Sequence, residues 1–600
     1  MRRDALANRD PANPRRVSGT SISGLAAVPS AAEPSADRTG VLRRVVAQPL
    51  WVHALLLLVV VAGFAALSRP GTGFSSDEGA ALTQARVLRD TGDWYYRYPL
   101  SSLDGARDAS PFLRADIGSK GVAPYAKHPL YPVVLRAAGA DTAGALALSV
   151  LGTVGAAVAA ALLTRRFSEV ESSAVLALWL TGVATPLLFD SGLVIAHTLA
   201  AAAIGGVLVL SIAAVDGTRR RWASLLGAAA CALVAAMLRT EGVLVVGVLA
   251  VVLVVVVRSR WSVLVAGAVA AAGTAAVVID RLAVRAIVGV PELTPPNTVT
   301  HGIRGRWDGF YVTWLSTSYR PRSGVGTMLW IVLAAVAVAA ILLRRGTIRP
   351  AVFAAVAAIG TAAYALRLVA DPAGVAPGLL VTVPVLWALA WFGARAGRPR
   401  PWTIGAGAAI GGAAVILLTQ YSIGGGVEWG GRYFALLLPV AVAVVVAASF
   451  PVVGRVLPDP RSRAVAGGAA VAVTVLVAVW GLTALRQGHE RAEDLSRQIA
   501  VAAADVDAAA GTGRPLLVTS NRLLPQLLHD DVDRYDWIAA DEDRLPAFVE
   551  QEAAGGAGAA VLVVPTGSGV VDELAGAGWD IHPSGTSSVY DILVLERTGR

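Results

Sequence analysis

The chain has 600 residues, of which 55% are hydrophobic and only 16% are charged, and its mean hydropathy is +0.61. Soluble domains carry about 25% charged residues, so this composition excludes an ordinary soluble protein. The net charge of +9 lies in short arginine patches between long apolar runs, which is typical of membrane topology and argues against nucleic-acid binding. Cys231 is the single cysteine, which excludes an intrachain disulfide and a multi-cysteine metal site.

Residues 1–48 are rich in Arg, Ala, Ser and Pro and show no periodic apolar pattern. This composition predicts a disordered cytoplasmic tail. The apolar run that follows, at about 50–68, is long enough to be a retained membrane span instead of a cleaved signal.

Apolar runs of spanning length recur along the chain, and a span needs roughly 20 such residues. They predict about 13 spans: 50–68, 141–163, 172–189, 196–214, 222–238, 242–257, 262–280, 325–343, 351–368, 375–394, 402–420, 433–450 and 464–485. With the N-terminus inside, each cytoplasmic turn is rich in arginine, as positive-inside topology requires: Arg165 and Arg166, Arg219 to Arg221, Arg258 to Arg260, Arg344 to Arg349, Arg395 to Arg400, and Arg455 to Arg463. The odd number of spans places the C-terminus on the outer face.

Three segments lie outside the bilayer on this topology. Residues 69–140 and 281–324 form long outer loops, and loops of this length are usually functional or disordered. After about residue 486 the composition becomes soluble, with predicted strands and helices in alternation: strands in 514–520, 559–565 and 587–597, and helices in 545–555 and 570–578. The predicted fold is a polytopic α-helical membrane domain, 49–485, with a C-terminal extracytoplasmic α/β domain on a mixed sheet, 486–600. A lid, packing or acceptor-docking role is expected for that domain.

Ionisable residues beside membrane spans are costly and therefore mark candidate sites. Here they gather toward the outer side: Asp77, Glu78, Lys127, His128, Asp190, His197, Arg239, Glu241, Glu428 and Arg432. A transporter would place such groups near the midplane on broken helices, whereas an enzyme of the outer leaflet would place them here.

The acidic pair Asp77–Glu78 stands in FSSDEGAALTQ, just beyond the first span. It has an ordinary interpretation as the first turn of a helix with Ser76 as N-cap. A carboxylate on a short helix beside the bilayer is also well positioned for chemistry. The two interpretations are compatible.

The chain uses only two lysines, Lys120 and Lys127, in one outer loop. A surface position explains them simply. Alternatively, Lys127 and His128 form a compact cationic pair before a proline-started helix, suited to a phosphate.

Three further outer turns carry polar groups. Arg239 and Glu241 form either a structural salt bridge or a substrate contact. An interfacial aromatic belt explains Trp429 and Tyr433, but it explains the charged residues beside them less well. Asp190 and His197 stand at the two ends of a turn, where a helix-end histidine is the simpler interpretation. The sequence has no HExxH, no CxxC and no dense Asp cluster, so no cofactor is predicted, and a divalent metal is left open.

Four motifs in this order resemble the polytopic GT-C glycosyltransferases: SSDEGA, KHPLYPVVL, LRTEG and EWGGRYFALLLP. That superfamily includes protein mannosyltransferases, aminoarabinose transferases and actinobacterial arabinosyl- and mannosyltransferases, which use a polyprenyl-phosphate sugar as donor. The resemblance covers about 50–450. It departs in detail, with one proline in KHPLYP and Thr240 where proline is common. It implies an inverting transfer to a cell-envelope glycan, lipid or protein on the outer face of a bacterial plasma membrane.

The resemblance also implies roles for the candidate residues. Asp77 is expected to be the general base, with Glu78 supporting it. Donor phosphate contacts are expected from Lys127, His128, Arg239 and Arg432, and other substrate contacts from Glu241, Asp190, His197, Trp429, Glu428 and Tyr433.

The Ala-, Val-, Gly- and Arg-rich composition suggests a GC-rich actinobacterial genome, which favours a decaprenyl-phosphate arabinose or mannose donor. Three alternatives stay open: a lipid-linked-sugar flippase or other transporter, a lipid-linked glycan polymerase or ligase, and a non-catalytic scaffold that presents the C-terminal domain.

Overall fold

The structure is a computed structural model of the chain, which divides into two compact units. The fold described below is that of the larger unit, residues 49–600. The predicted tail, 1–48, lies outside the described residues apart from Gln48. From there to Thr598 the structure describes the chain except for 69–70, 72, 104, 113–120, 126, 218–219, 289–312, most of 315–377, 393–398, 420–429, 458, 511–513 and 588.

Nine helices of the described part are long and apolar enough to cross a membrane, so this is a multi-pass membrane protein. They are α2 (Leu50–Leu67), α6 (Thr142–Phe167), α9 (His197–Val215), α10 (Arg221–Leu238), α11 (Thr240–Val257), α12 (Arg260–Val288), α18 (Arg400–Thr419), η3 with α19 (Arg432–Leu437 and Leu438–Val456), and α20 (Pro460–Ala510). Each corresponds to one of the predicted spans.

Two predicted spans are not continuous helices. The span at 172–189 is divided into α7 (Glu171–Val183) and the short α8 (Leu187–Asp190). The span at 375–394 is divided into α16 (Leu379–Thr382) and α17 (Pro384–Phe392). Both breaks lie at a proline, Pro186 and Pro384, because the residue before a proline is disfavoured in the helical conformation. The predicted spans 325–343 and 351–368 lie mostly outside the described residues.

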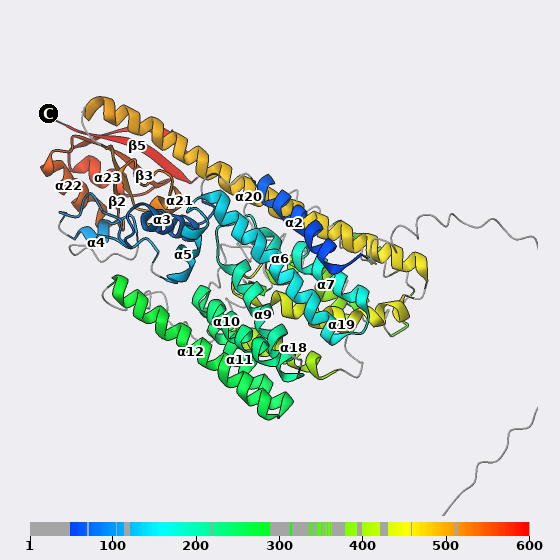
Figure 1. Cartoon of the computed structure of the whole chain (residues 1–600). Helices are drawn as coiled ribbons and strands as arrows, with labels where there is room; N and C mark the ends of the chain where they lie inside the picture. Colours follow the sequence, from blue (N-terminus) through cyan, green and yellow to red (C-terminus); the bar gives the residue numbers. More distant parts are fainter. Residues whose placement is uncertain are drawn as a thin grey trace, which may run out of the picture. The chain divides into compact units, whose positions relative to one another are not determined.

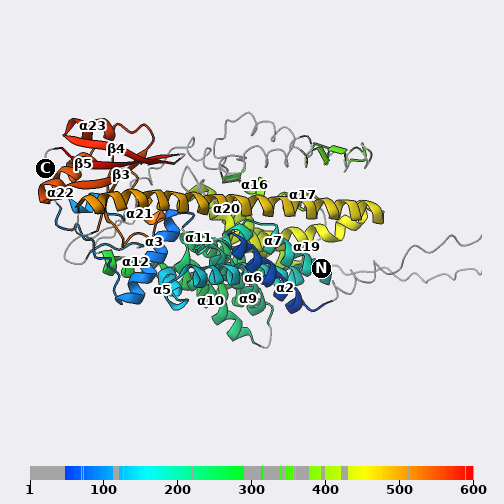
Figure 2. The ribbon, with the colours of Figure 1, turned by 90° about the horizontal axis from the view of Figure 1, so that it is seen from above.

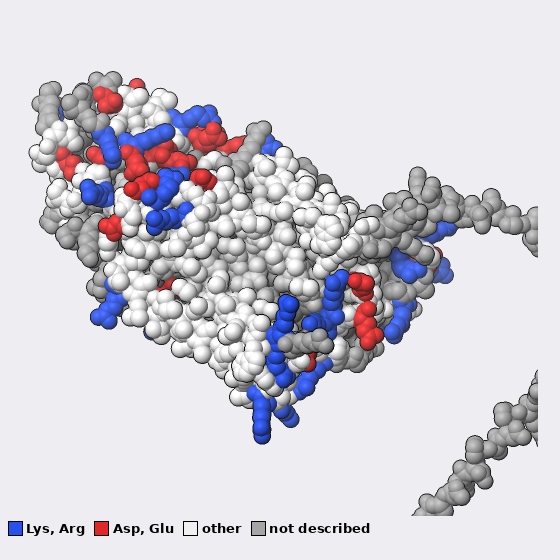
Figure 3. Space-filling model, viewed as in Figure 1, with Lys and Arg blue, Asp and Glu red and all other residues white. Residues whose placement is uncertain are grey.

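The membrane helices pack around one large core, in which α6, α9, α10, α11, α18 and α19 are neighbours (Figures 1 and 2). On the face shown in Figure 3, a broad uncharged zone separates two charged regions. Lys and Arg predominate in the region at the ends of α6, α10 and α11, while acidic and basic residues mix over the C-terminal domain. An uncharged band between charged ends is what a bilayer-embedded surface requires.

The C-terminal domain confirms the predicted α/β fold on a mixed sheet. Its elements are β1 (Leu516–Thr519), α21 (Leu524–Leu527), β2 (Asp536–Ala539), α22 (Leu545–Gly555), β3 (Ala559–Pro565), α23 (Val570–Gly576), β4 (Trp579–Thr586) and β5 (Tyr590–Arg597). The sheet order is β2-β1-β3-β5-β4, with β1 parallel to β2 and β3, and β5 antiparallel to β3 and β4. Strands β2 and β4 were not predicted, because β2 is short and β4 is interrupted at Pro583 and Gly585.

The change of composition near residue 486 does not coincide with a break in the chain. Helix α20 runs through it, from the membrane bundle to the sheet, as Figures 1 and 2 show. Its second half packs Leu495, Ile499 and Val506 against buried residues of β1 and β3. One rigid helix thus belongs to both the membrane domain and the soluble domain.

The predicted outer loop, 69–140, is largely folded in its described residues. It contains α3 (Ser76–Asp90), α4 (Ala106–Ala109) and α5 (Leu130–Ala137), together with an antiparallel bridge between Tyr96 and Val122. Helix α3 packs against both α5 and α21. Of the second predicted loop, 281–324, the first residues continue α12 to Val288, and most of the rest lies outside the described residues.

Candidate active site

Helix α3 begins one residue earlier than predicted, because Ser75 and not Ser76 is its N-cap. With Ser75 in this place, Glu78 becomes the third helical residue, and its Oε1 accepts a hydrogen bond from the Ser75 N–H at 2.8 Å. This is the carboxylate half of a capping box. Had Ser76 been the cap, Gly79 would stand in third place and could offer no acceptor.

Glu78 has a structural function at this position. It is buried, and its second oxygen, Oε2, accepts a hydrogen bond from the Val194 N–H at 2.8 Å. Val194 lies in the turn between α8 and α9. Glu78 therefore caps its own helix and attaches that helix to the membrane domain.

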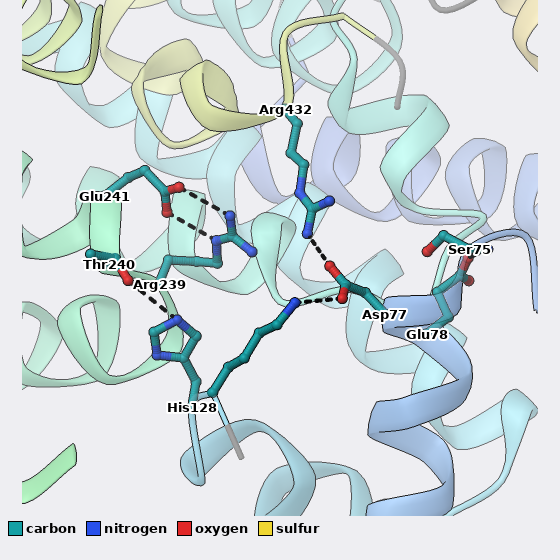
Figure 4. Close-up of polar contacts among 9 residues, drawn as sticks. Ser75, Asp77, Glu78, His128, Arg239, Thr240, Glu241 and Arg432 are labelled. Carbon is teal, nitrogen blue, oxygen red and sulfur yellow. Dashed lines mark hydrogen bonds and ion pairs between the residues drawn. The ribbon is translucent and has the colours of Figure 1, made fainter. Parts of the chain in front are cut away.

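The neighbouring Asp77 has a different environment. Its Oδ1 lies 2.6 Å from Lys127 Nζ and its Oδ2 lies 2.5 Å from Arg432 Nη2, so each oxygen has its own cation. Figure 4 shows Arg432 and Asp77 pointing toward one another from η3 and α3. Burial alone would raise the pKa of Asp77, but Lys127 and Arg432 outweigh it and hold the pKa well below its usual range. Asp77 is thus an ionised carboxylate between two cations.

Two glycines position Arg432. Gly430 and Gly431 both have φ +69°, in the left-handed region that glycine adopts without strain. A Cβ on Gly430 would overlap the ring of Pro186, and one on Gly431 would lie 2.9 Å from the Thr313 carbonyl oxygen. The motif EWGGRYFALLLP contains both glycines, but the sequence alone does not show that their left-handed backbone positions Arg432. Two adjacent glycines before a charged residue were the available signal.

Lys127 and His128 do not form the predicted compact pair. Lys127 contacts Asp77, whereas His128 Nε2 lies 3.4 Å from Thr240 Oγ1 and His128 Nδ1 lies 3.7 Å from Asp280 Oδ1. The two adjacent side chains thus have different partners, Asp77 for Lys127 and the pair Thr240 and Asp280 for His128. Asp280, near the C-terminal end of α12, is not among the residues that the sequence singled out, although an acidic residue at the end of a span is a recognisable signal.

Arg239 and Glu241 form the salt bridge that the sequence left open. Nε and Nη2 of Arg239 lie 3.0 and 3.1 Å from the two oxygens of Glu241, in a bidentate arrangement. Both side chains are largely buried. The Tyr433 ring centroid lies 5.9 Å from the guanidinium carbons of both Arg239 and Arg432. The turn between α10 and α11 therefore lies close to η3.

The remaining candidates fall into two groups. Asp190 and His197 are buried at the two ends of the turn that contains Val194. His197 is close enough for the charges of Arg239, Arg432 and Asp77 to act on it. Glu428 and Trp429 lie outside the described residues.

Within the described part of the chain, no group of three His, Cys, Asp or Glu side chains is placed to hold a metal ion. The geometry there is one of cations around a carboxylate. Such an arrangement can hold an anion and can accept a proton at Asp77.

No family model and no curated protein matches the chain. Solved structures do match it. One is ArnT from Cupriavidus metallidurans bound to undecaprenyl phosphate, with 17% identity, 91% of this chain and 98% of that chain covered, and a TM-score of 0.47.

A second match is the archaeal oligosaccharyltransferase AglB from Archaeoglobus fulgidus in complex with an inhibitory peptide and a dolichol-phosphate. Here the identity is 13%, the coverage is 85% of this chain and 69% of that chain, and the TM-score is 0.41. At these identities and TM-scores the likeness does not assign a reaction to this chain.

Proposed function

We propose that this protein is a membrane glycosyltransferase that moves a sugar from a polyprenyl-phosphate donor to an acceptor hydroxyl. The observation that carries the proposal is Asp77, held between Lys127 and Arg432 on segments that adjoin the membrane spans. A carboxylate and two cations are the groups that such a transfer needs, and the membrane domain suits a donor with a long lipid tail. The order of the four sequence motifs supports the same reaction.

The reaction needs one base and several cations. The acceptor oxygen attacks the anomeric carbon, the bond from that carbon to the phosphate oxygen breaks, and its electron pair stays with the phosphate. Asp77 takes the acceptor proton, which contributes roughly 10²–10⁴-fold to the rate. Lys127 and Arg432 stabilise the negative charge that develops on the leaving phosphate. Direct displacement inverts the configuration of the anomeric carbon.

A carboxylate between two cations is a weak base, so Asp77 must lose part of this pairing before it can take a proton efficiently. A bound donor phosphate is a phosphodiester with one negative charge, and it competes with the Asp77 carboxylate for Lys127 and Arg432. As the cations turn to the phosphate, the pKa of Asp77 rises toward its ordinary value and the carboxylate becomes a stronger base. Donor binding would therefore activate the base.

The other sequence candidates have secondary roles in this proposal. Arg239 and His128 supply further positive charge near the phosphate. Glu241 holds Arg239 in place. The sugar and acceptor contacts are assigned to Asp190, His197, Glu428, Trp429 and Tyr433.

The proposed topology follows the arginine-rich turns. Residues 1–48 are cytoplasmic, 49–485 form the catalytic membrane domain, and 486–600 lie outside a bacterial plasma membrane. The acceptor is then a cell-envelope glycan, lipid or protein, and decaprenyl-phosphate arabinose and mannose are the first donors to test.

The test is transfer of labelled sugar from polyprenyl-phosphate donors to envelope acceptors, comparing the wild type with Asp77→Asn. We expect kcat to fall about 10²–10⁴-fold, while donor affinity stays equal or increases, because Asp77 no longer competes with the phosphate for the cations. Asp90→Asn is the matched control, since Asp90 ends the same helix and is exposed. Full activity in folded Asp77→Asn would refute the assignment of the base. Saturable lipid-linked-sugar transport without transfer would favour a flippase instead.

A further inference from the structure

We infer that the C-terminal domain is part of the catalytic unit, because it fixes the position of Asp77 by packing against α3 and the segment that leads into it. The inference rests on the proposed role of Asp77 as the base. It assigns positioning residues in two places: Gly79 with the backbone of α21, and Phe74 with Gly488 of α20.

Gly79 is a point of very close approach between α3 and the C-terminal domain. A Cβ at this position would overlap the carbonyl oxygen of Gln526 and would lie 2.8 Å from its carbonyl carbon and 2.9 Å from the Cβ of His529. Real Cβ atoms essentially never come within 3.0 Å of another atom. Only glycine therefore allows the backbone of α21 to lie directly against the first turn of α3, two residues after Asp77.

A second contact holds the segment before α3. A Cβ on Gly488 would overlap the ring of Phe74, which stands three residues before Asp77. The next residue of α20, His489, has its Nδ1 3.1 Å from the Ser68 carbonyl oxygen, at the end of α2. Helix α20 therefore fixes the segment that joins the first membrane span to α3.

A third contact lies farther along α3. Arg86 Nη2 lies 2.6 Å from Asp530 Oδ1, and Arg86 Nη1 donates to the His529 carbonyl oxygen at 3.5 Å. Both side chains of the ion pair are partly exposed, so the pair orients the helix more than it stabilises it.

Helix α3 also packs against α5. Leu82 and Ala85 of α3 belong to the same buried cluster as Tyr131 and Leu135 of α5. Lys127 stands in the short segment that leads into α5. Because α3 lies between α5 and α21, a displacement of α21 would move Asp77 relative to Lys127.

The test is Gly79→Ala, with Gly555→Ala as its control. Both glycines lie in helices, but a Cβ on Gly555 of α22 would meet no atom within 4 Å. Gly79→Ala must separate α3 from α21 by about 1 Å or more, and a displacement of 1 Å can cost about 10²-fold in rate. We expect kcat to fall about 10²-fold, with a much smaller change of KM for the donor and an altered acidic limb of the pH profile.

A second measurement needs no activity. The chain has only two lysines, Lys120 and Lys127, so ¹³C-methylation of the amines gives two side-chain NMR signals, and Lys120→Arg assigns them. We expect the Lys127 signal to shift in Gly79→Ala and to keep its place in Gly555→Ala. An unchanged Lys127 signal in folded Gly79→Ala overturns the inference, whether or not the wild type transfers sugar. Failure of the proposed function would instead show as no transfer by the wild type.

If Gly79→Ala does not accumulate in the membrane, the contact between Phe74 and Gly488 of α20 provides the test of the inference. Gly488→Ala should shift the Lys127 signal and lower kcat, because the new Cβ overlaps the Phe74 ring. In the double variant Gly488→Ala/Phe74→Leu, the leucine side chain is smaller than the phenylalanine ring, so both the signal and kcat should return toward wild type. A wild-type signal in Gly488→Ala, or a double variant no closer to wild type than the single one, overturns the inference.

Discussion

Removing one cation from Asp77 should move the acidic limb of the pH profile by an amount that depends on the burial of that cation. Each carboxylate oxygen has one cation, Lys127 at 2.6 Å and Arg432 at 2.5 Å. The Lys127 side chain is 41% exposed and that of Arg432 only 15%. Water therefore screens the lysine more strongly than the arginine.

A nearby opposite charge lowers the pKa of a carboxyl by about 1–3 units. Both Lys127→Gln and Arg432→Gln should therefore raise the pKa of Asp77. Because Arg432 is the more buried cation and is screened less by water, we expect the larger rise in Arg432→Gln. One unit corresponds to about 1.4 kcal/mol between the two protonation states.

The assay is kcat/KM as a function of pH, because this parameter reports the free enzyme. In the wild type, Asp77 stays ionised well below the ordinary carboxyl pKa of about 3.9, so its acidic limb lies at very low pH. In Arg432→Gln the acidic limb of the kcat/KM profile should move to a higher pH, toward the range in which it can be measured. In Lys127→Gln it should move in the same direction by a smaller amount. Arg89→Gln is the control, since Arg89 lies at the exposed end of α3 and pairs with Asp90.

The linkage has a definite sign. The pKa of Asp77 is lower in the folded protein than in the unfolded chain, where it is about 3.9. The ion pairs of Asp77 therefore contribute their full stability above the unfolded pKa, and this stability is lost as the pH falls through the folded pKa. Arg432→Gln should therefore be less stable than the wild type at pH 7. An acidic limb in Arg432→Gln that coincides with that of the wild type would show that Arg432 does not control Asp77, and the reasoning would fail.

Two further variants test the surroundings of the pair. Glu78→Gln keeps one acceptor for two buried N–H donors, so we expect the thermal unfolding midpoint in detergent to fall, by an amount equivalent to about 1–3 kcal/mol, while kcat per folded molecule stays near wild type. A kcat loss as large as that of Asp77→Asn would contradict this structural role. Gly431→Ala strains a left-handed residue and crowds Thr313, so donor KM should rise as Arg432 is displaced. Unchanged donor binding, measured with the same labelled lipid, would contradict the positioning of Arg432 by this glycine.

The membrane helices were predictable from the sequence because hydropathy and arginine placement act locally. Nine described helices correspond to predicted spans, although α20 continues to Ala510, well past the predicted end at 485. The prolines at 186 and 384 account for the two interrupted spans. The predicted strands of the C-terminal domain were found because they are continuous apolar runs, such as AAVLVVP. Strand β2 has only four residues, and its place in the sheet depends on pairing with β1, which no local pattern reveals.

The candidate site was predictable in its composition but not in its pairing. The sequence identified Asp77, Lys127 and Arg432 separately, yet Arg432 lies 355 residues from its partner. Contacts over such separations are set by the packing of whole helices. The contact of Gly79 with α21 could not be anticipated either, since an isolated glycine near a helix start has several explanations.

The adjacent acids Asp77 and Glu78 show how one helix start can have two functions. Consecutive residues on a helix point about 100° apart, so the two carboxylates cannot face the same environment. Glu78 accepts hydrogen bonds from two backbone N–H groups and is buried, so both of its oxygens are engaged and shielded from a substrate. Among the described residues, Asp77 is held by the side chains of Lys127 and Arg432, which are cations that a phosphate can attract away. Backbone partners are fixed, whereas lysine and arginine side chains can rotate. Asp77 is therefore the carboxylate that donor binding can release, and the helix capped by Glu78 is what holds it in place.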